Sequence, residues 1–215
     1  MMKAIIIDWD DTLVDFEYWL RSRWIIANHR VERHYGIPLY DVTFWKVFNR
    51  NSIYYFHYVE DTLIELGLEP NEDFIKEITK HFLNVEVKDL VFPGVSIFLH
   101  RMKEKGFKIA MYTNGHEKSH KFRVKTSGLA KYFDVIKYGG LVSKPYYEPF
   151  VEISEQLNVP FNEIYAIGDD IRDLLSPYNL GMTPIVMDLK HQGKTMLNKP
   201  FKTFYSYEEL INEIC

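Results

Sequence analysis

The chain has 215 residues, of which 47% are hydrophobic and 26% are charged, and its formal net charge is −4. This composition is typical of a globular protein with a full hydrophobic core, and the small negative charge argues against nucleic acid or an anionic membrane as a partner. The only cysteine is Cys215, so no internal disulfide can form, which is compatible with a reducing cytoplasm. The short apolar stretch at the amino terminus predicts neither a signal peptide nor a membrane span.

The first predicted strand, residues 4–7, has the sequence Ala-Ile-Ile-Ile and ends in a group of carboxylates. Apolar residues at consecutive positions are typical of a parallel strand that is buried on both faces. Asp8, Asp10 and Asp11 follow the strand, at the end where open α/β sheets bind their ligands. Side-chain alternation would turn Asp8 and Asp10 to the same side. Their mutual repulsion then favours a cation that prefers oxygen ligands, such as Mg²⁺.

Residues 15–90 are predicted to be helical, because apolar side chains recur there at three- and four-residue spacing. A first helix ends at Gly36, a second ends at Gly67, and a third begins after Asn71, whose side chain is suited to cap it. The block begins directly after the acidic residues and ends before the next strand. It is therefore predicted to be an insertion that covers the carboxyl ends of the strands.

Strands and helices alternate from residue 95 onward. A helix before Gly106 precedes a strand at 107–112, a turn at Thr113–Gly115, a helix at 116–127, a strand at 133–136 and a helix that begins near Pro149. Further strands are predicted at 164–167 and 184–187, a helix between them ends at Gly181, and Ser206 with Glu209 can cap a last helix. The alternation predicts a doubly wound, Rossmann-like parallel sheet. This α/β core comprises residues 1–14 and 91–215, and the inserted α-helical cap comprises residues 15–90.

Four groups of polar residues fall at the predicted strand ends, which meet in one crevice of a doubly wound sheet. Alone, each group has an ordinary explanation as a turn, a surface lysine or a helix cap. Together they suit a phosphate site, because a metal ion and a lysine would reduce the repulsion between a carboxylate nucleophile and a phosphate dianion. A threonine hydroxyl can hold the phosphoryl oxygens. The groups are Asp8 with Asp10, Thr113 with Asn114, Lys144, and Asp169 with Asp173.

These groups resemble the four motifs of the haloacid dehalogenase-like hydrolase superfamily. Asp8-Trp9-Asp10-Asp11-Thr12 is similar to its DxDxT motif, Thr113 to the threonine of its second motif, Lys144 in Ser-Lys-Pro to its lysine, and Asp169 with Asp173 to its GDxxxD motif. The resemblance covers the core on both sides of the insertion, and the insertion resembles the helical cap of relatives. It implies an aspartyl-phosphate mechanism with Mg²⁺ as the cofactor.

The resemblance also implies a role for each residue. Asp8 would be the nucleophile, and Asp10 would be the general acid and base. The phosphoryl group would be bound by Thr113, Asn114 and Lys144. The implied metal ligands are the Asp8 side chain, the Asp10 backbone carbonyl and Asp169, with Asp173 in support, and Asp170 stays open as a ligand or a helix cap.

Asp10 favours a phosphatase over a dehalogenase, because dehalogenases of this superfamily need no acid at that position. A phosphomutase on the same fold and a non-catalytic phospho-aspartate signalling module remain alternatives. The expected partner is a small phosphorylated metabolite in the cytoplasm, with no nucleic acid and no membrane, and the oligomeric state is left open. Candidate substrate contacts in the cap are Phe16, Trp19, Tyr54, Tyr55 and His57.

A basic stretch follows the predicted turn at Thr113–Gly115. It begins at His116 and contains Lys118, Lys121, Arg123 and Lys125. The stretch is interpreted as a solvated helix face. A less favoured alternative is that it attracts an anionic substrate.

Overall fold

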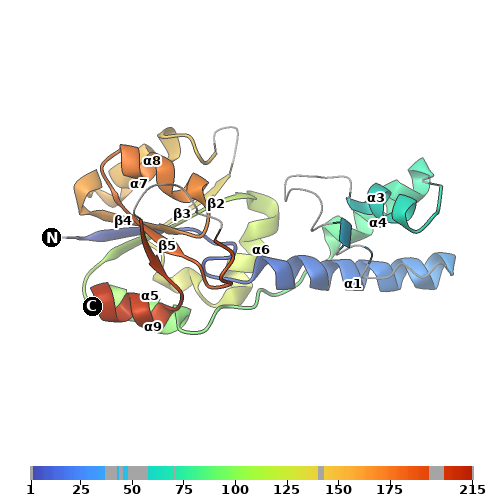
Figure 1. Ribbon diagram of the computed structural model, residues 1–215, viewed down its shortest axis with the longest axis horizontal. Helices are drawn as coiled ribbons and strands as arrows, with labels where there is room; N and C mark the ends of the chain where they lie inside the picture. Colours follow the sequence, from blue (N-terminus) through green and yellow to red (C-terminus); the bar gives the residue numbers. More distant parts are fainter. Residues whose placement is uncertain are drawn as a thin grey trace. The chain divides into compact units, whose positions relative to one another are not determined.

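The structure, a computed structural model, describes residues 2–36, 43, 46–47, 58–69, 71–139, 143–193 and 201–214 (Figure 1). The chain forms two compact units. Unit 1 comprises Met1–Phe16 and Asp89–Cys215, and unit 2 comprises Glu17–Lys88. None of the helices among these described residues is both long enough and apolar enough to cross a membrane.

Unit 1 is built on a six-stranded sheet in the order β3-β2-β1-β4-β5-β6, in which all neighbouring strands are parallel. The predicted doubly wound α/β fold is therefore confirmed. Successive strands are added on one side of β1 and then on the other, so β1 lies at the point where the strand order reverses and a ligand crevice is expected. The strands are β1 (Ala4–Ile7), β2 (Lys108–His116), β3 (Val135–Gly139), β4 (Ile164–Gly168), β5 (Thr183–Met187) and β6 (Lys202–Phe204).

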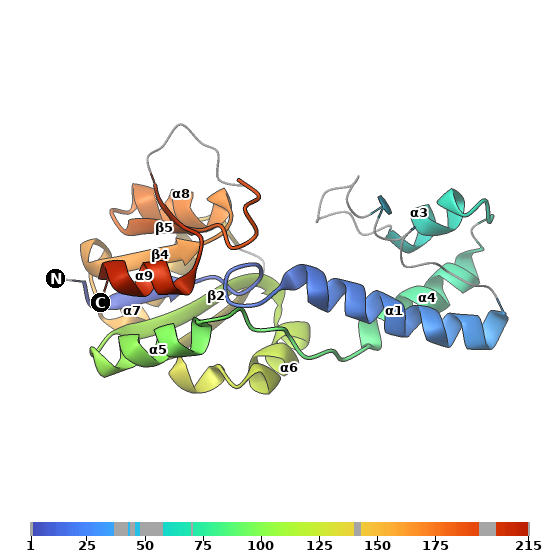
Figure 2. The same cartoon turned by 60° about the horizontal axis from the view of Figure 1, so that its bottom comes forward.

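Helices cover both faces of this sheet (Figures 1 and 2). On one face lie α5 (Val95–Glu104), α6 (Glu117–Ser127) and α9 (Tyr207–Ile214), and on the other lie α7 (Glu148–Leu157) and α8 (Ile171–Asn179). Two 3₁₀ turns, η1 (Ala130–Tyr132) and η2 (Phe161–Glu163), precede β3 and β4.

The side chains of β1 are buried on both faces, as the run of apolar residues predicts. Ile5 and Ile7 pack in one core cluster with α5 and α9, and Ala4 and Ile6 pack in the other with α7. Burial contributes roughly 1.5–3 kcal/mol for each isoleucine side chain. The end of β1, where Asp8 follows, is thus held firmly in the middle of the sheet.

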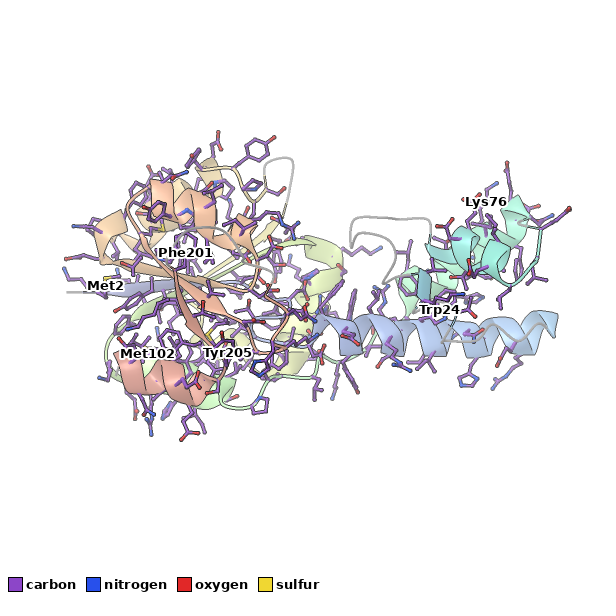
Figure 3. All side chains as sticks on the ribbon, in the orientation of Figure 1. Met2, Trp24, Lys76, Met102, Phe201 and Tyr205 are labelled. Atoms are coloured by element: carbon purple, nitrogen blue, oxygen red, sulfur yellow. The ribbon has the colours of Figure 1, made fainter. Side chains whose placement is uncertain are left out.

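Unit 2 contains α1 (Phe16–Tyr35), α3 (Tyr58–Glu65) and α4 (Glu72–Asn84), with Phe16 itself counted in unit 1. The predicted cap of α4 is confirmed, because the Asn71 side chain accepts the N–H groups of Asp73 (2.9 Å) and Phe74 (3.2 Å). Trp24 on α1 is buried and packs edge-on against Phe82 of α4, with 6.2 Å between the ring centroids (Figure 3). The apolar stripes therefore form the core of this unit.

Parts of the helical prediction lie outside the described residues. These are the positions of Trp45, Phe48 and Phe56 in the second helix and the candidate substrate contacts Tyr54, Tyr55 and His57.

One prediction for unit 1 was wrong, and one strand was missed. Thr113–Gly115 is not a turn, because β2 continues through it to His116, with a register shift against β3 between Thr113 and His116. The edge strand β6 was not predicted at all.

The two chain segments that connect the units pair with each other inside unit 1. The N–H of Asp15 donates to the carbonyl of Leu90 (2.9 Å), and the N–H of Phe92 donates to the carbonyl of Leu13 (3.0 Å). Asp89, the first residue of unit 1 after the insertion, is therefore fixed close to the loop that follows β1.

Candidate active site

Asp8 lies directly after β1, at the reversal point of the sheet. Its N–H donates to the carbonyl of Ile167 (2.9 Å), which extends the pairing between β1 and β4 by one residue. Its side chain is buried, and one carboxylate oxygen accepts a hydrogen bond from the ammonium group of Lys144. Asp8 and Lys144 are 136 residues apart in sequence, so the fold brings together two residues that the sequence predicts as catalytic.

Lys144 is a buried lysine that connects two carboxylates. Its Nζ donates to Asp8 and, at 2.7 Å, to Oδ1 of Asp173. Asn114 fixes the lysine backbone, because its side-chain oxygen accepts the Lys144 N–H (2.8 Å) and its amide group donates to the Lys144 carbonyl (3.3 Å). Asn114, predicted to bind substrate, thus has a clear role in holding Lys144.

Asp173 completes this arrangement from α8. Asp170 caps the helix by accepting the Arg172 N–H (2.9 Å), and the Asp173 carboxylate accepts the Asp170 N–H (3.1 Å) in return. Of the two roles that the sequence left open for Asp170, the structure shows the helix cap, and the same carboxylate pairs with Arg172 at 2.6 Å. Gly168 permits this packing, because a Cβ there would lie 2.4 Å from Cβ of Asp173.

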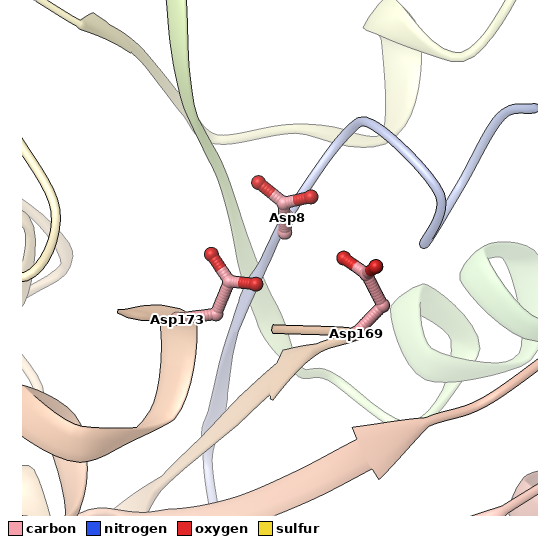
Figure 4. Close-up of side chains that lie close together, drawn as sticks. All are labelled: Asp8, Asp169 and Asp173. Carbon is pink, nitrogen blue, oxygen red and sulfur yellow. The ribbon is translucent and has the colours of Figure 1, made fainter. Parts of the chain in front are cut away.

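Three carboxylates gather at this edge of the sheet. Oxygen atoms of Asp8, Asp169 and Asp173 all lie within 4.8 Å of one another. Figure 4 shows the three groups, which converge from the loop after β1, the end of β4 and the first turn of α8. Three carboxylates this close together repel one another, which favours a cation among them.

The electrostatics of the cluster support that conclusion. Burial, which the Lys144 ammonium group only partly opposes, raises the pKa of Asp8 well above its usual value, and the carboxylates of Asp173 and Asp169 raise it further. Burial disfavours the charge on Lys144, but Asp173 and Asp8 outweigh burial and raise the pKa of Lys144. A further positive charge beside Asp8, such as a metal ion, would lower its pKa.

Thr113 is buried in β2, next to β1 in the sheet. Its hydroxyl oxygen accepts the N–H of Gly115 (3.0 Å), which fixes the side chain within its own strand. Its predicted contact with a phosphoryl group stays a prediction.

The described contacts of the Asp10 side chain are with residues of α6 rather than with the three carboxylates. Its Oδ1 accepts a hydrogen bond from Nη2 of Arg123 (2.5 Å), and its Oδ2 lies 3.1 Å from Nε2 of His120. Partial burial of Asp10 would raise its pKa, but Arg123 outweighs burial and lowers the pKa far below its usual value. A lowered pKa favours the ionised carboxylate that a general base requires, whereas a general acid requires the protonated form.

The interpretation of the basic stretch as a solvated face was wrong for Arg123. Arg123 and the nearby His120 are buried, while Lys121 on the same helix is exposed and pairs with Glu117 at 2.7 Å. Sequence reasoning also missed Asp89, which binds Arg123. The three-residue spacing of His120 and Arg123 places them on one helix face, but the neighbouring lysines conceal that signal.

Comparison with known proteins assigns the family. A model described as a haloacid dehalogenase-like hydrolase matches residues 2–180, which is most of the chain. The chain belongs to the haloacid dehalogenase-like hydrolase family. The resemblance inferred from the four motifs is therefore confirmed.

Relatives and a solved structure of this hydrolase family match along most of the chain. A phosphorylated carbohydrates phosphatase of Thermotoga maritima is 26% identical, and the matched region covers 98% of this chain and 97% of the relative. A phosphoglycolate phosphatase of Aquifex aeolicus is 26% identical and covers 80% of this chain and 78% of its own. The crystal structure of a predicted phosphoglycolate phosphatase from Haemophilus somnus is 18% identical, covers 100% and 98% of the two chains, and has a TM-score of 0.75, which supports the fold.

The donor set of this hydrolase fits a hard divalent cation. All the candidate side-chain ligands of the cluster are carboxylates, and Mg²⁺ prefers oxygen ligands. Asp169 and the second oxygen of Asp8 are suited to this role, whereas one oxygen of Asp173 already binds Lys144. The cluster thus fits the divalent metal of the family.

Proposed function

We propose that this haloacid dehalogenase-like hydrolase is a Mg²⁺-dependent phosphatase that cleaves a small phosphomonoester through an aspartyl-phosphate on Asp8. The observation that carries the proposal is the buried ammonium group of Lys144, which contacts both Asp8 and Asp173. A cation in that position attracts a phosphate group toward a carboxylate of the same charge. The names of two relatives, a phosphorylated carbohydrates phosphatase and a phosphoglycolate phosphatase, support the same reaction.

The proposed metal site consists of the Asp8 and Asp169 side chains and the Asp10 backbone carbonyl, with Asp173 in support. Bound Mg²⁺ would act as a Lewis acid that reduces the negative charge of the phosphoryl oxygens. Lys144 holds the nucleophile in place and balances its charge. Thr113 is proposed to hold the phosphoryl group, assisted by Asn114 and Lys144.

The proposed reaction has two steps. Asp10 enters the first step protonated, having taken a proton from solvent. An oxygen of Asp8 then attacks phosphorus, the bond from phosphorus to the ester oxygen breaks, and Asp10 gives that proton to the leaving alkoxide. In the second, Asp10 takes a proton from water, the water oxygen attacks phosphorus, and the bond to Asp8 breaks. Inorganic phosphate and an alcohol are formed, and both aspartates return to their initial states.

Asp10 favours this reaction over the alternatives. A dehalogenase attacks carbon and needs no general acid, whereas an ionised carboxylate two residues after Asp8 suits the activation of water. A phosphomutase would return the phosphoryl group to a sugar, and a signalling module would keep it on Asp8. The assays below distinguish both from a phosphatase.

The insertion at residues 15–90 is proposed to act as a helical cap that excludes water and selects the leaving group. We further propose that the enzyme works in the cytoplasm, which the absence of any internal disulfide permits. The substrate would be a small phosphorylated metabolite rather than nucleic acid or a membrane lipid.

The first experiment measures phosphate release. The protein would be incubated with 4-nitrophenyl phosphate and with a panel of sugar phosphates, phosphoglycolate and nucleotides, with Mg²⁺ or with chelator. We expect release of phosphate only with Mg²⁺. Release of no phosphate from any ester, or equal release with chelator, would contradict the proposal, and a transferred phosphoryl product would indicate a mutase.

Substitution of the two aspartates tests their separate roles. Asp10→Asn should lower kcat at least about 100-fold, the usual contribution of a general acid or base. Asp8→Asn should be at least as damaging. Full activity of Asp10→Asn would exclude its proposed role while leaving that of Asp8 intact.

A further inference from the structure

Arg123 forms a buried ion-pair cluster that the proposed reaction steps do not use. Its side chain is 1% exposed, and that of Asp89 is 0% exposed. Nε of Arg123 donates to both oxygens of Asp89 (2.9 and 3.0 Å), and Nη2 lies 2.8 Å from Oδ1 of Asp89. This bidentate geometry holds the guanidinium plane in one orientation.

Asp89 is itself held from a second side. The indole N–H of Trp9 donates to its Oδ2 at 3.1 Å, and Trp9 is fully buried in the sheet core. Asp89 therefore connects three places far apart in sequence. These are the loop after β1, the segment that returns from the insertion, and α6.

His120 supports Arg123 from the other end of the guanidinium group. Nη1 of Arg123 lies 2.8 Å from Nε2 of His120. The same Nε2 lies 3.1 Å from Oδ2 of Asp10, and Nδ1 lies 3.1 Å from the hydroxyl of Ser119. Gly115 leaves space for this ring, because a Cβ there would lie 1.8 Å from Cε1 of His120.

Nη2 of this fixed guanidinium group contacts Asp10 as well as Asp89. The contact from Nη2 to Oδ1 is 2.5 Å, and Asp10 is the most exposed carboxylate of the cluster, with 26% of its side chain exposed. A rigid, buried cation thus contacts a carboxylate at the open end of the cluster. If Arg123 served only to attach α6 to the core, its pairing with Asp89 would suffice.

We propose that Arg123 is a positioning residue for Asp10, and that Asp89 orients Arg123 for this task. By holding Oδ1, while His120 lies 3.1 Å from Oδ2, the guanidinium group fixes the rotamer of Asp10, the group that exchanges the proton with the leaving group and with water. The inference rests on the proposed phosphatase function, because it needs Asp10 to act as a general acid and base. Positional errors of about 1 Å in such a group can cost about 100-fold in rate.

The test compares two leaving groups. A nitrophenolate leaves with little help from an acid, whereas an alkoxide needs the proton. Wild-type protein, Arg123→Gln, Asp10→Asn and the double variant would be assayed with 4-nitrophenyl phosphate and with the alkyl phosphate that the wild type cleaves fastest. We expect Arg123→Gln to lower kcat for the alkyl ester at least about 10-fold more than for the aryl ester.

The double variant provides the second criterion. If Arg123 acts through Asp10, Arg123→Gln should add less than about 2-fold to the loss caused by Asp10→Asn alone. Equal losses for both esters together with additive losses in the double variant would overturn the proposal, because a general structural defect produces that result. Lys121→Gln removes an exposed charge from the same helix. It should leave the ratio of the alkyl to the aryl rate unchanged, both alone and in combination with Asp10→Asn.

Two further variants keep the test decisive if Arg123→Gln does not fold. Arg123→Lys retains the charge but loses the bidentate geometry, and Asp89→Asn retains the shape but weakens the hold on Arg123. Both should lower the alkyl rate more than the aryl rate, by a smaller factor than Asp10→Asn. A ratio of alkyl to aryl rate equal to that of the wild type in both variants would overturn the inference. If the wild-type protein cleaved no ester, the proposed function itself would be refuted instead.

Discussion

Replacing Asp169 by asparagine should raise the stability of the metal-free protein and abolish its stabilisation by Mg²⁺. Asp169 belongs to a cluster of three carboxylates whose oxygen atoms lie within 4.8 Å of one another. The substitution keeps the size of the side chain but removes one negative charge. A site that is strained by repulsion in order to bind a cation should gain stability when that charge is lost.

The size of the effect follows from Coulomb's law. Two unit charges at 4.8 Å repel each other by about 3 kcal/mol at an effective dielectric constant near 20. Asp169 takes part in two such pairs, but solvent screening and proton uptake by Asp8 relieve much of the repulsion. We therefore expect a net gain of roughly 1–2 kcal/mol in the free energy of unfolding. For a chain of 215 residues this raises Tm by roughly 2–8 °C.

Thermal unfolding with chelator and with Mg²⁺ measures both effects. Wild-type protein should gain about 2.7 kcal/mol when Mg²⁺ is present at 100 times its Kd, whereas Asp169→Asn should gain much less. Glu152→Gln removes a charge that pairs with Lys137 outside the cluster, and it should leave the response to Mg²⁺ unchanged. A lower Tm of Asp169→Asn in chelator, or an undiminished response to Mg²⁺, would refute the reasoning.

Two further substitutions test the surroundings of the site. Gly168→Ala should lower kcat at least about 10-fold and destabilise the protein by about 1–3 kcal/mol, because the new Cβ would lie 2.4 Å from Cβ of Asp173; wild-type kcat would contradict this. Burial would raise the pKa of Asp134, but hydrogen bonds from Lys103 and the Ile109 N–H outweigh it and lower that pKa. A depressed pKa in the folded state contributes stability above the unfolded value near 3.9 and loses it as the pH falls further. Asp134→Asn should therefore cost roughly 1 kcal/mol at pH 7 and progressively less below about pH 4 in denaturant titrations, and a cost independent of pH would contradict this.

The parts of the fold that sequence reasoning predicts are those with strong local patterns. The apolar run of β1 indicates burial on both faces, and Asn71 has the side chain that a helix cap requires. The acidic groups were placed together because parallel strands end at one edge of the sheet. This argument needs only the order of the elements.

The parts of the fold that sequence reasoning misses depend on tertiary contacts that leave no local pattern in the sequence. β6 is a strand of three residues, Lys202–Phe204, of which one is buried, so no alternation is visible. The turn predicted at Thr113–Gly115 has a typical turn composition, but pairing with β3 keeps this segment in β2. Tertiary pairing outweighs local propensity at such positions.

The cluster around Arg123 was missed for a different reason. α6 carries basic residues on most of its faces, so its sequence does not indicate which one points inward. Arg123 is recognisable only through Asp89 and Asp10, which lie 34 and 113 residues away in the chain. The spatial arrangement therefore adds to the sequence motifs a candidate residue that acts on Asp10.

The most direct test of the account is a search for phosphate on Asp8 during turnover. The protein would be mixed with its best phosphomonoester and Mg²⁺, quenched in acid within milliseconds, and digested for mass spectrometry. The account predicts a phosphorylated peptide with the modification on Asp8, and no such peptide from Asp8→Asn. Steady turnover with an unmodified Asp8 at every quench time, or with phosphate on a different residue, would contradict it.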